Sequence, residues 1–225
     1  MTHDTPTHAT PCATDPAGRG LAVVVSGPSG AGKTTLIKHL MLRHPRSHFS
    51  ISATTRAPRG EEVDGVDYRF LGREAFLELR DNGGLLEWAE VHGEFYGTPR
   101  GEVCPYLQDG RHVFLDIDVQ GALSVKRALP EQSWLLFVLP PDMALLSARL
   151  RGRGTDAESV IARRLANALG ELAELPHFDA VVVNDELGGA VERARRLLGD
   201  RERNAAAWLA EGGREFLNRA FGVSI

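Results

Sequence analysis

Short apolar segments alternate with amphipathic ones along most of this chain. The first apolar segment, Leu21–Ser26, is rich in valine and stops at a glycine, as a fully buried parallel strand does. The apolar residues that follow recur at helical spacing until Pro45, namely Leu36, Ile37, Leu40 and Met41. The beginning of the pattern therefore predicts a strand followed directly by a helix.

The same alternation returns three times further along the chain. The predicted strand and helix pairs are His112–Asp116 with Ala122–Leu129, Trp134–Leu139 with Met143–Leu150, and Ala180–Asn184 with Ala190–Leu198. Repeated units of this kind connect parallel strands through helices that pack on the faces of the sheet. We therefore predict an α/β fold with a parallel sheet flanked by helices.

The segment from residue 50 to residue 99 interrupts this rhythm. Asp64-Gly65 has the composition of a hairpin turn, Arg73–Asn82 predicts a short helix, and Leu85–Val91 predicts a strand. We interpret residues 50–99 as an inserted, mostly β subdomain. The core of the main domain, residues 20–200, is then expected to comprise residues 20–49 and 100–200.

Three further segments are predicted from composition and periodicity. Residues 1–19 are rich in Thr, Pro, Ala and His without apolar periodicity, which predicts a flexible tail. Residues 149–165, approximately, are dense in arginine and contain Gly152 and Gly154, which predicts a mobile helical lid. Residues 201–225 form a C-terminal extension, in which Arg201–Phe221 predicts one amphipathic helix that packs on the body.

Composition limits the function classes. A chain of 225 residues, 43% hydrophobic and 25% charged, suits one α/β domain with small insertions. The formal net charge of −4 argues against a general nucleic-acid binder. Neither a membrane-spanning apolar run nor a secretory signal is expected. The two cysteines, Cys12 and Cys104, lack the spacing of a zinc or redox site, so we predict reduced thiols and a cytoplasmic location.

The glycine-rich segment after the first strand carries the clearest chemistry. It has the phosphate-loop pattern G-x-x-x-x-G-K-T, followed by a further threonine, in Gly27, Pro28, Ser29, Gly30, Ala31, Gly32, Lys33, Thr34 and Thr35. Glycines let successive amides point at phosphate oxygens, and the start of the helix adds partial positive charge. Lys33 is expected to reach the β- and γ-phosphates of ATP, and Thr34 to offer its hydroxyl to Mg²⁺.

Two acids close another apolar strand. Asp116 and Asp118 are expected at the carboxyl edge of the sheet, where the phosphate loop also begins. Asp118 is our candidate for the magnesium-side acid, and the alternative for either residue is to cap the following helix. These features predict phosphoryl chemistry but leave the acceptor open, because GTPases, motor ATPases and small-molecule kinases share the loop.

Several further motifs, in order along residues 21–198, make the chain resemble the guanylate kinase family. They are Ser52-Ala53-Thr54-Thr55-Arg56-Ala57-Pro58-Arg59, Gly65-Val66-Asp67-Tyr68, Glu87-Trp88-Ala89, Tyr96-Gly97-Thr98, Asp116-Ile117-Asp118-Val119-Gln120-Gly121, Arg151-Gly152-Arg153-Gly154-Thr155 and Val183-Asn184-Asp185. The resemblance implies transfer of a phosphoryl group from ATP to GMP, and to dGMP, with Mg²⁺.

The resemblance also implies roles for individual residues. It places the GMP phosphate on Arg56, Arg59, Tyr68 and Tyr96, and the guanine base and its neighbourhood on Glu87, Ser52, Thr98 and Asp116. It implies that Arg153 and Arg164 act from the lid, and that Arg149 and Asn184 lie near the adenine of ATP. Guanidinium forks suit a phosphate dianion, and a carboxylate suits the two donors of the guanine edge.

Two alternatives share parts of this pattern. A non-catalytic guanylate-kinase-like interaction module would keep the fold, but the intact Lys33, Thr34 and Asp118 argue against it. A related kinase that acts on a ribose bisphosphate would keep the phosphate loop, but it would not need Glu87 and the two tyrosines. Oligomeric state does not follow from the sequence.

Overall fold

The computed structural model describes Cys12 and residues 20–152, 157–200 and 205–225. Contacts divide the chain into two compact units, which we describe separately. Unit 1 comprises Met1–Val24 and His44–Trp134, and unit 2 comprises Val25–Arg43 and Leu135–Ile225. Most of the predicted tail, the lid residue Arg153 and the first residues of the C-terminal extension lie outside the described residues.

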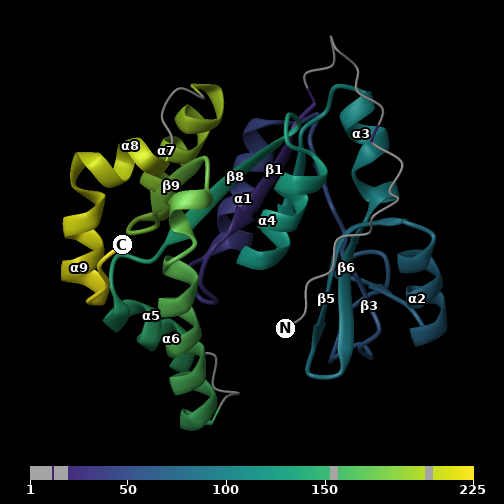
Figure 1. Cartoon of the computed structure of the whole chain (residues 1–225), viewed down its shortest axis with the longest axis horizontal. Coiled ribbons are helices and arrows are strands. Elements are labelled where there is room, and N and C mark those ends of the chain that lie inside the picture. Colours follow the sequence, from purple (N-terminus) through teal and green to yellow (C-terminus); the bar gives the residue numbers. More distant parts are fainter. Residues whose placement is uncertain (1–11, 13–19, 153–156, 201–204) are drawn as a thin grey trace. The chain divides into compact units, whose positions relative to one another are not determined.

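The larger sheet has five strands in the order β2-β7-β1-β8-β9, of which Figure 1 labels β1, β8 and β9. These strands are β1 (Ala22–Ser26), β2 (His48–Phe49), β7 (Val113–Asp116), β8 (Ser133–Leu139) and β9 (Ala180–Val183). β2 pairs with β7, and β8 with β9, in parallel. Every residue of β1 and β8 is buried, which explains their unbroken apolar sequences, since a strand covered on both faces has no polar side. The predicted parallel α/β sheet is confirmed.

Helices follow these strands as predicted. They are α1 (Lys33–Arg43), α4 (Val119–Ala128), α5 (Met143–Arg151) and α7 (Leu187–Gly199), with α3 (Cys104–Gln108) and α6 (Glu158–Leu172) between them. Side chains cap three of them: Asp118, Asp142 and Glu186 accept hydrogen bonds from backbone N–H groups in the first turns of α4, α5 and α7. A carboxylate at this position stabilises a helix start by about 1 kcal/mol.

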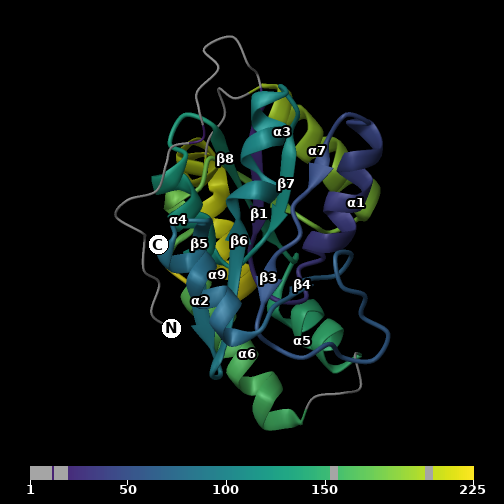
Figure 2. The same cartoon turned by 90° about the vertical axis from the view of Figure 1, so that its right-hand side faces the viewer.

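A second, four-stranded sheet lies within unit 1, in the order β4-β3-β6-β5 (Figure 2). Its elements are β3 (Ala53–Thr54), β4 (Arg69–Phe70), β5 (Leu85–Val91) and β6 (Glu94–Pro99), with the helix α2 (Arg73–Asp81). Phe76 of α2 packs with Ala53, Leu85 and Phe95 in a buried cluster, and the Phe76 and Phe95 rings stack at 5.4 Å. This cluster joins α2 to the sheet.

The prediction of a hairpin turn at Asp64-Gly65 is wrong. β3 and β4 pair in parallel, so the chain between them makes a longer excursion rather than a direct reversal. Gly65 does turn the backbone, with φ +73°, and its N–H donates to the Tyr68 carbonyl. The Asp64 carboxylate accepts a hydrogen bond from the Phe70 N–H at 2.8 Å, and this side chain therefore connects the loop to β4.

The C-terminal extension differs from the single helix predicted over Arg201–Phe221. The described part contains α8 (Ala205–Trp208), a π-helical turn at Leu209–Gly213 and α9 (Arg214–Phe221). Helical geometry breaks at Glu211 and Gly212, where Gly212 adopts φ +111°. Only glycine takes this conformation without strain. The apolar periodicity continued through the break and therefore did not reveal it.

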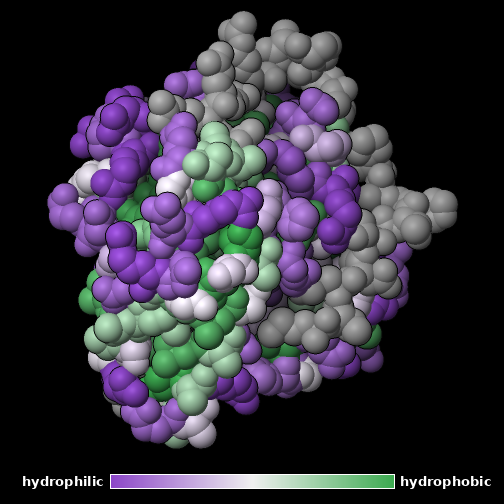
Figure 3. All heavy atoms as spheres, turned by 60° about the vertical axis from the view of Figure 1, so that its left-hand side comes forward, coloured by the Kyte–Doolittle hydropathy of each residue, from purple (hydrophilic) through white to green (hydrophobic). Residues whose placement is uncertain are grey.

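α8 packs against β9 and leaves a hollow of about 710 Å³ beside it. Ala180–Val183, Leu197 and Trp208 contribute apolar side chains to its wall, and Asp185, Arg193 and Arg196 contribute charged ones. Figure 3 brings the side with the C-terminal helices forward and shows a band of hydrophobic residues bordered by hydrophilic ones. Within the described part of the extension, α8 packs on β9 of unit 2.

The cysteines also differ from the prediction. Cys12 and Cys104 form a disulfide with their Cα atoms 5.2 Å apart, so the expectation of two reduced thiols is wrong. The two residues are separated by 92 positions in the chain, and Cys104 is the first residue of α3. Spacing alone did not reveal the pairing because this contact depends on the fold of unit 1.

Among the helices that the structure describes, none combines the length and the apolar character needed to cross a membrane.

Candidate functional site

The phosphate-loop sequence joins the end of β1 to the start of α1 in unit 2. Gly27 has φ +127°, and a Cβ atom there would lie 2.3 Å from the Val138 carbonyl oxygen. Gly32 has φ +91°, and a Cβ atom there would lie 2.4 Å from Nδ2 of Asn184. Backbone conformation therefore favours glycine at both positions, and the neighbouring backbone also leaves no space for a side chain at Gly27.

Lys33 is the first residue of α1 and its side chain folds back over the loop. Its Nζ donates to the carbonyl oxygen of Gly27 at 2.7 Å and lies 3.4 Å from that of Pro28. An ammonium group and the amides of a helix start both attract phosphate oxygens. Thr34 and Thr35 follow in the first turn and are exposed.

Asn184 and Arg149 lie against the same loop. The buried Asn184 side chain follows β9 and donates from Nδ2 to the Ala31 carbonyl at 2.8 Å. Arg149 of α5 approaches the Gly30, Ala31 and Asn184 carbonyl oxygens at 3.4, 3.5 and 3.4 Å, at the long limit of hydrogen bonding. The structure thus brings these two predicted residues together with the loop.

The predicted lid falls on the end of α5 and the first half of α6. Arg153 lies outside the described residues, and Arg164 is half-buried on α6. Next to the gap, Arg151 pairs with Glu158 at 2.8 Å, and both side chains are exposed. Leu146 and Leu150 of α5 pack with Ile161 and Ala168 of α6, which fixes the two helices to one another.

Unit 1 holds a separate cavity of about 240 Å³ that gathers most of the predicted acceptor residues. Its lining includes Ser52, Tyr68, Glu87, Tyr96, Asp116 and Asp118, with Ala89, Val91, Gly97 and Ile117 between them. Thr98 joins the group through Glu87, to which its hydroxyl donates at 2.6 Å. Residues from five segments of the chain therefore converge on one small polar cavity.

Glu87 is the most perturbed acid of this cavity. The pKa of the Glu87 carboxyl is raised to about 7: burial is the main cause, hydrogen bonding with Thr98 acts against it, and the negative charge of Asp118 contributes a smaller rise. A carboxylate held in such a place favours a ligand that brings its own hydrogen-bond donors. Tyr68 shares this environment, and burial is the main cause of the raised pKa of its phenol.

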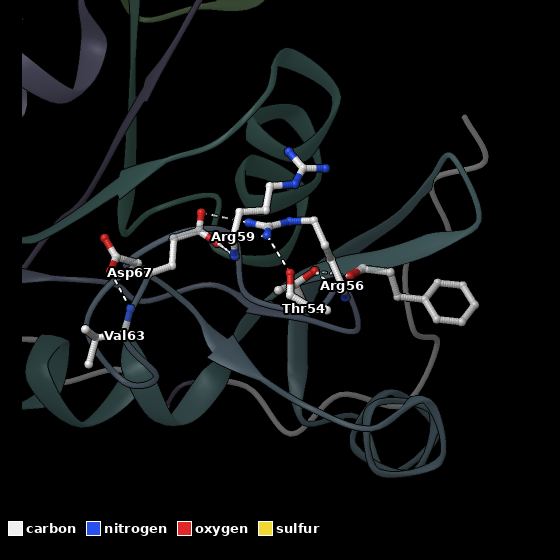
Figure 4. Close-up of polar contacts among 8 residues, drawn as sticks. Thr54, Arg56, Arg59, Val63 and Asp67 are labelled. Atoms are coloured by element: carbon white, nitrogen blue, oxygen red, sulfur yellow. Dashed lines mark hydrogen bonds and ion pairs between the residues drawn. The ribbon is translucent and has the colours of Figure 1, made fainter. Parts of the chain in front are cut away.

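Arg56 lies beside the two tyrosines. Its guanidinium carbon is 5.2 Å from the centre of the Tyr68 ring, and the Tyr68 and Tyr96 rings meet edge to face at 6.2 Å. Glu62 forms two hydrogen bonds with the guanidinium, at 2.8 and 3.0 Å (Figure 4). The hydrogen bonds with Glu62 raise the pKa of the Arg56 guanidinium, burial lowers it, and the Tyr96 hydroxyl raises it again. The net shift is a rise.

Arg59, Asp116 and Asp118 are the remaining predicted residues of unit 1. Arg59 is exposed, and its backbone N–H donates to Glu62 at 2.7 Å. Asp118 caps α4, accepting from the Gly121 N–H at 2.7 Å, and it is also one of the residues that line the cavity. The capping alternative is thus observed for Asp118, and Asp116 lies on β7 at the cavity wall.

Sequence reasoning did not identify Glu62 as part of the site. It lies six residues after Arg56 in a polar loop, where an acid is ordinarily solvated. The signals available were the turn residues Pro58 and Gly60 between the two, which bring the chain back toward Arg56. The apolar cavity walls at Ala89, Val91 and Ile117 were also not predicted as part of the site.

A phosphate loop lies between a buried parallel strand and a helix, and unit 1 of the same chain holds a cavity lined by a buried acid and two tyrosines, with Arg56 beside one of them. These features define the class of phosphate-loop α/β kinases. The comparisons narrow this class. The sequence model described as guanylate kinase matches residues 19–201. The chain therefore belongs to the guanylate kinase family.

Individual relatives agree with this assignment. The guanylate kinase of Nitratidesulfovibrio vulgaris is 52% identical over 176 residues, which cover 78% of this chain and 84% of that protein. The guanylate kinase of Anaeromyxobacter dehalogenans is 50% identical over 197 residues, 87% of either chain. The crystal structure of guanylate kinase from Anaplasma phagocytophilum matches with a TM-score of 0.64 at 31% identity, covering 92% of this chain and 98% of that one.

Proposed function

We propose that this protein is an ATP:GMP phosphotransferase that converts ATP and GMP, or dGMP, to ADP and GDP, or dGDP. The observation that carries the proposal is the cavity of unit 1, in which a buried carboxylate, Glu87, and two tyrosines beside Arg56 line one small space. Such a site suits a ligand with hydrogen-bond donors at one end and a phosphate at the other.

Glu87 is the proposed reader of the base. Its carboxylate accepts from N1–H and from the exocyclic amino group of guanine, and Ser52, Thr98 and Asp116 supply polar groups around the nucleoside. Adenine lacks this pair of donors. A buried acceptor left unpaired costs roughly 1–3 kcal/mol, which corresponds to about one to two orders of magnitude in favour of GMP over AMP.

Arg56, Arg59, Tyr68 and Tyr96 are the proposed ligands of the GMP phosphate. The proximity of the Arg56 guanidinium to the Tyr68 ring supports this assignment, as does the edge-to-face contact of the two tyrosines. Guanidinium groups match phosphate oxygens in pairs, and phenolic hydroxyls donate further hydrogen bonds without adding charge.

The phosphate loop, from Gly27 to Thr35, is the proposed ATP site. Lys33 reaches the β- and γ-phosphates, Arg149 and Asn184 lie toward the adenine, and Arg153 and Arg164 stabilise the migrating phosphoryl group from the lid. Thr34 and Asp118 carry the hard oxygen ligands that Mg²⁺ prefers, so both fit a role in its binding. Bound with ATP, Mg²⁺ neutralises charge on the phosphates.

The proposed reaction needs no covalent enzyme intermediate. An oxygen of the GMP phosphate attacks the γ-phosphorus of ATP in line, and the bond from that phosphorus to the β,γ-bridging oxygen breaks as ADP leaves. The attacking oxygen is already ionised, so no general base is required. We also propose that the protein works in the cytoplasm, without nucleic-acid or membrane partners.

A coupled assay of ADP release with GMP, dGMP, AMP, CMP and UMP tests the proposal. We expect turnover with GMP, measurable turnover with dGMP, and at least tenfold lower kcat/KM with AMP. Equal turnover with AMP and GMP would refute the role of Glu87. Tight GMP binding without any turnover would instead favour a non-catalytic interaction module.

A further inference from the structure

Glu62 makes contacts that the proposed reaction does not use directly. Its carboxylate accepts hydrogen bonds from one edge of the Arg56 guanidinium, from Nη1 to Oε2 at 2.8 Å and from Nη2 to Oε1 at 3.0 Å. The second N–H of Nη1 donates to the Ala57 carbonyl at 2.7 Å. These three bonds fix both the position and the plane of the guanidinium.

The remaining edge of Arg56 is the one that a ligand can use. A guanidinium has five N–H groups, and Nε–H with the second N–H of Nη2 forms a fork that neither Glu62 nor Ala57 engages. The Tyr96 hydroxyl also interacts with this guanidinium, and Tyr96 lines the cavity. The aromatic rings of Tyr68 and Phe70 lie 5.2 and 5.7 Å from the guanidinium carbon. Because Tyr68 also lines the cavity, the plane held by Glu62 lies beside the space proposed for GMP.

Glu62 also offsets the cost of placing a charge at this position. The Arg56 residue is 8% exposed, and a cation so far removed from water is unfavourable without a counter-ion. Arg56 in turn is the main cause of the lowered pKa of the Glu62 carboxyl, which therefore stays ionised at neutral pH.

The same carboxylate organises the second candidate arginine. Oε2 of Glu62 accepts from the backbone N–H of Arg59 at 2.7 Å, and the N–H of Glu62 donates to the Arg59 carbonyl at 3.1 Å. The Glu62 side chain thus fixes the orientation of the Arg56 guanidinium and also holds the backbone of Arg59.

We propose that Glu62 is a positioning residue of the acceptor site, which orients Arg56 so that its Nε/Nη2 edge is presented to the phosphate of GMP. Glu62 does not contact GMP itself and does not compete with its phosphate. This inference rests on the proposed function, since it assigns Arg56 to the acceptor phosphate.

The test compares Glu62→Ala with Glu61→Ala, which removes the same charge from the neighbouring exposed position in the same loop. For Glu62→Ala we expect KM for GMP to rise about tenfold or more, with KM for ATP within about twofold of its original value. Glu62→Gln keeps an oxygen acceptor for Arg56 and should lie between the two. Glu61→Ala should behave like the unsubstituted protein.

Guanosine separates positioning of the phosphate ligand from general damage to the site. It carries the base but no phosphate, so its inhibition constant against GMP should change by less than about twofold in Glu62→Ala. Equal weakening of guanosine and GMP would overturn the proposal, as would an unchanged or lowered KM for GMP. If the unsubstituted protein has no activity with GMP, the proposed function fails instead, which the same assay reveals.

Discussion

At the scale of single residues, the buried carboxyl of Glu87 must be ionised to recognise guanine, and its ionisation lowers the stability of the folded protein. Burial raises its pKa from an ordinary 4.5 to about 7, so the folded protein binds this proton more tightly than the unfolded chain does. The resulting stabilisation is fully present below pH 4.5 and is lost as the pH rises through about 7. The ionised form needed to accept hydrogen bonds from guanine is therefore the less stable one.

Glu87→Gln should accordingly become more stable than the unsubstituted protein at alkaline pH. The gap between the two pKa values corresponds to about 3 kcal/mol, and we expect roughly 1–3 kcal/mol of extra unfolding free energy at pH 8. Near pH 4.5 the difference should largely vanish. Denaturant unfolding at both pH values measures this effect.

Glu90→Gln is the matched control for this prediction, since Glu90 lies exposed on the same strand, β5. It should show no comparable dependence on pH. An equal gain in both variants, or a gain in Glu87→Gln that persists at pH 4.5, would contradict the account of Glu87. The same variant should also raise KM for GMP.

At the scale of elements, the strand, loop and helix around the phosphate loop depend on backbone space. Gly27→Ala would place a methyl group 2.3 Å from the Val138 carbonyl oxygen at φ +127°. We expect the loop to shift, KM for ATP to rise about tenfold or more, and the unfolding free energy to fall by about 1–3 kcal/mol. Steady-state kinetics and denaturant unfolding measure the two effects.

Gly170→Ala is the control, because a Cβ atom at this position on α6 meets no atom within 4 Å. It should leave both quantities close to their original values. A Gly27→Ala protein with unchanged KM for ATP would show that the loop tolerates the side chain, and the glycine requirement would then be wrong.

Elements were predictable where one local signal decided the structure. The strand over Leu85–Val91 has the predicted bounds, because its apolar residues begin directly after Gly83-Gly84 and Gly93 follows soon after its end. The C-terminal helix was predicted as continuous because apolar periodicity passes through Gly212, whose backbone conformation carries no periodic signal. Asp64-Gly65 resembles a hairpin turn locally, but the pairing of β4 with β3 is parallel and depends on contacts distant in sequence.

The candidate site was predictable to the extent that motifs carried it. Six of the predicted acceptor and acid residues line one cavity, because each lies on or beside one of the strands β3 to β7. Glu62 was not predicted, because the value of its contact with Arg56 depends on burial of the arginine, which the sequence of a polar loop does not display.

At the scale of the whole molecule, the bond between Cys12 and Cys104 closes a long loop that contains the entire second sheet. A cross-link of this length stabilises mainly by restricting the unfolded chain, by about 2–4 kcal/mol. We expect dithiothreitol to lower the unfolding free energy of the oxidised protein by that amount. Denaturant unfolding with and without the reductant measures it.

A double variant, Cys12→Ser with Cys104→Ser, is the control and should not respond to the reductant. Mass analysis of the oxidised protein under denaturing conditions should find no thiol available for alkylation. Two alkylated cysteines in that experiment would show that the bond does not form. The thiol pool of a reducing cytoplasm would work against the bond, so its stability contribution depends on the redox state of the preparation.

The most direct test of the central claim follows the γ-phosphoryl group itself. With [γ-³²P]ATP, Mg²⁺ and GMP, we predict that the label appears in the β-phosphate of GDP, and that Lys33→Ala abolishes this transfer while GMP binding is largely kept. Lys38→Ala, exposed on the same helix, should retain transfer. Label that appears only as inorganic phosphate, or that moves to AMP as readily as to GMP, would contradict the account.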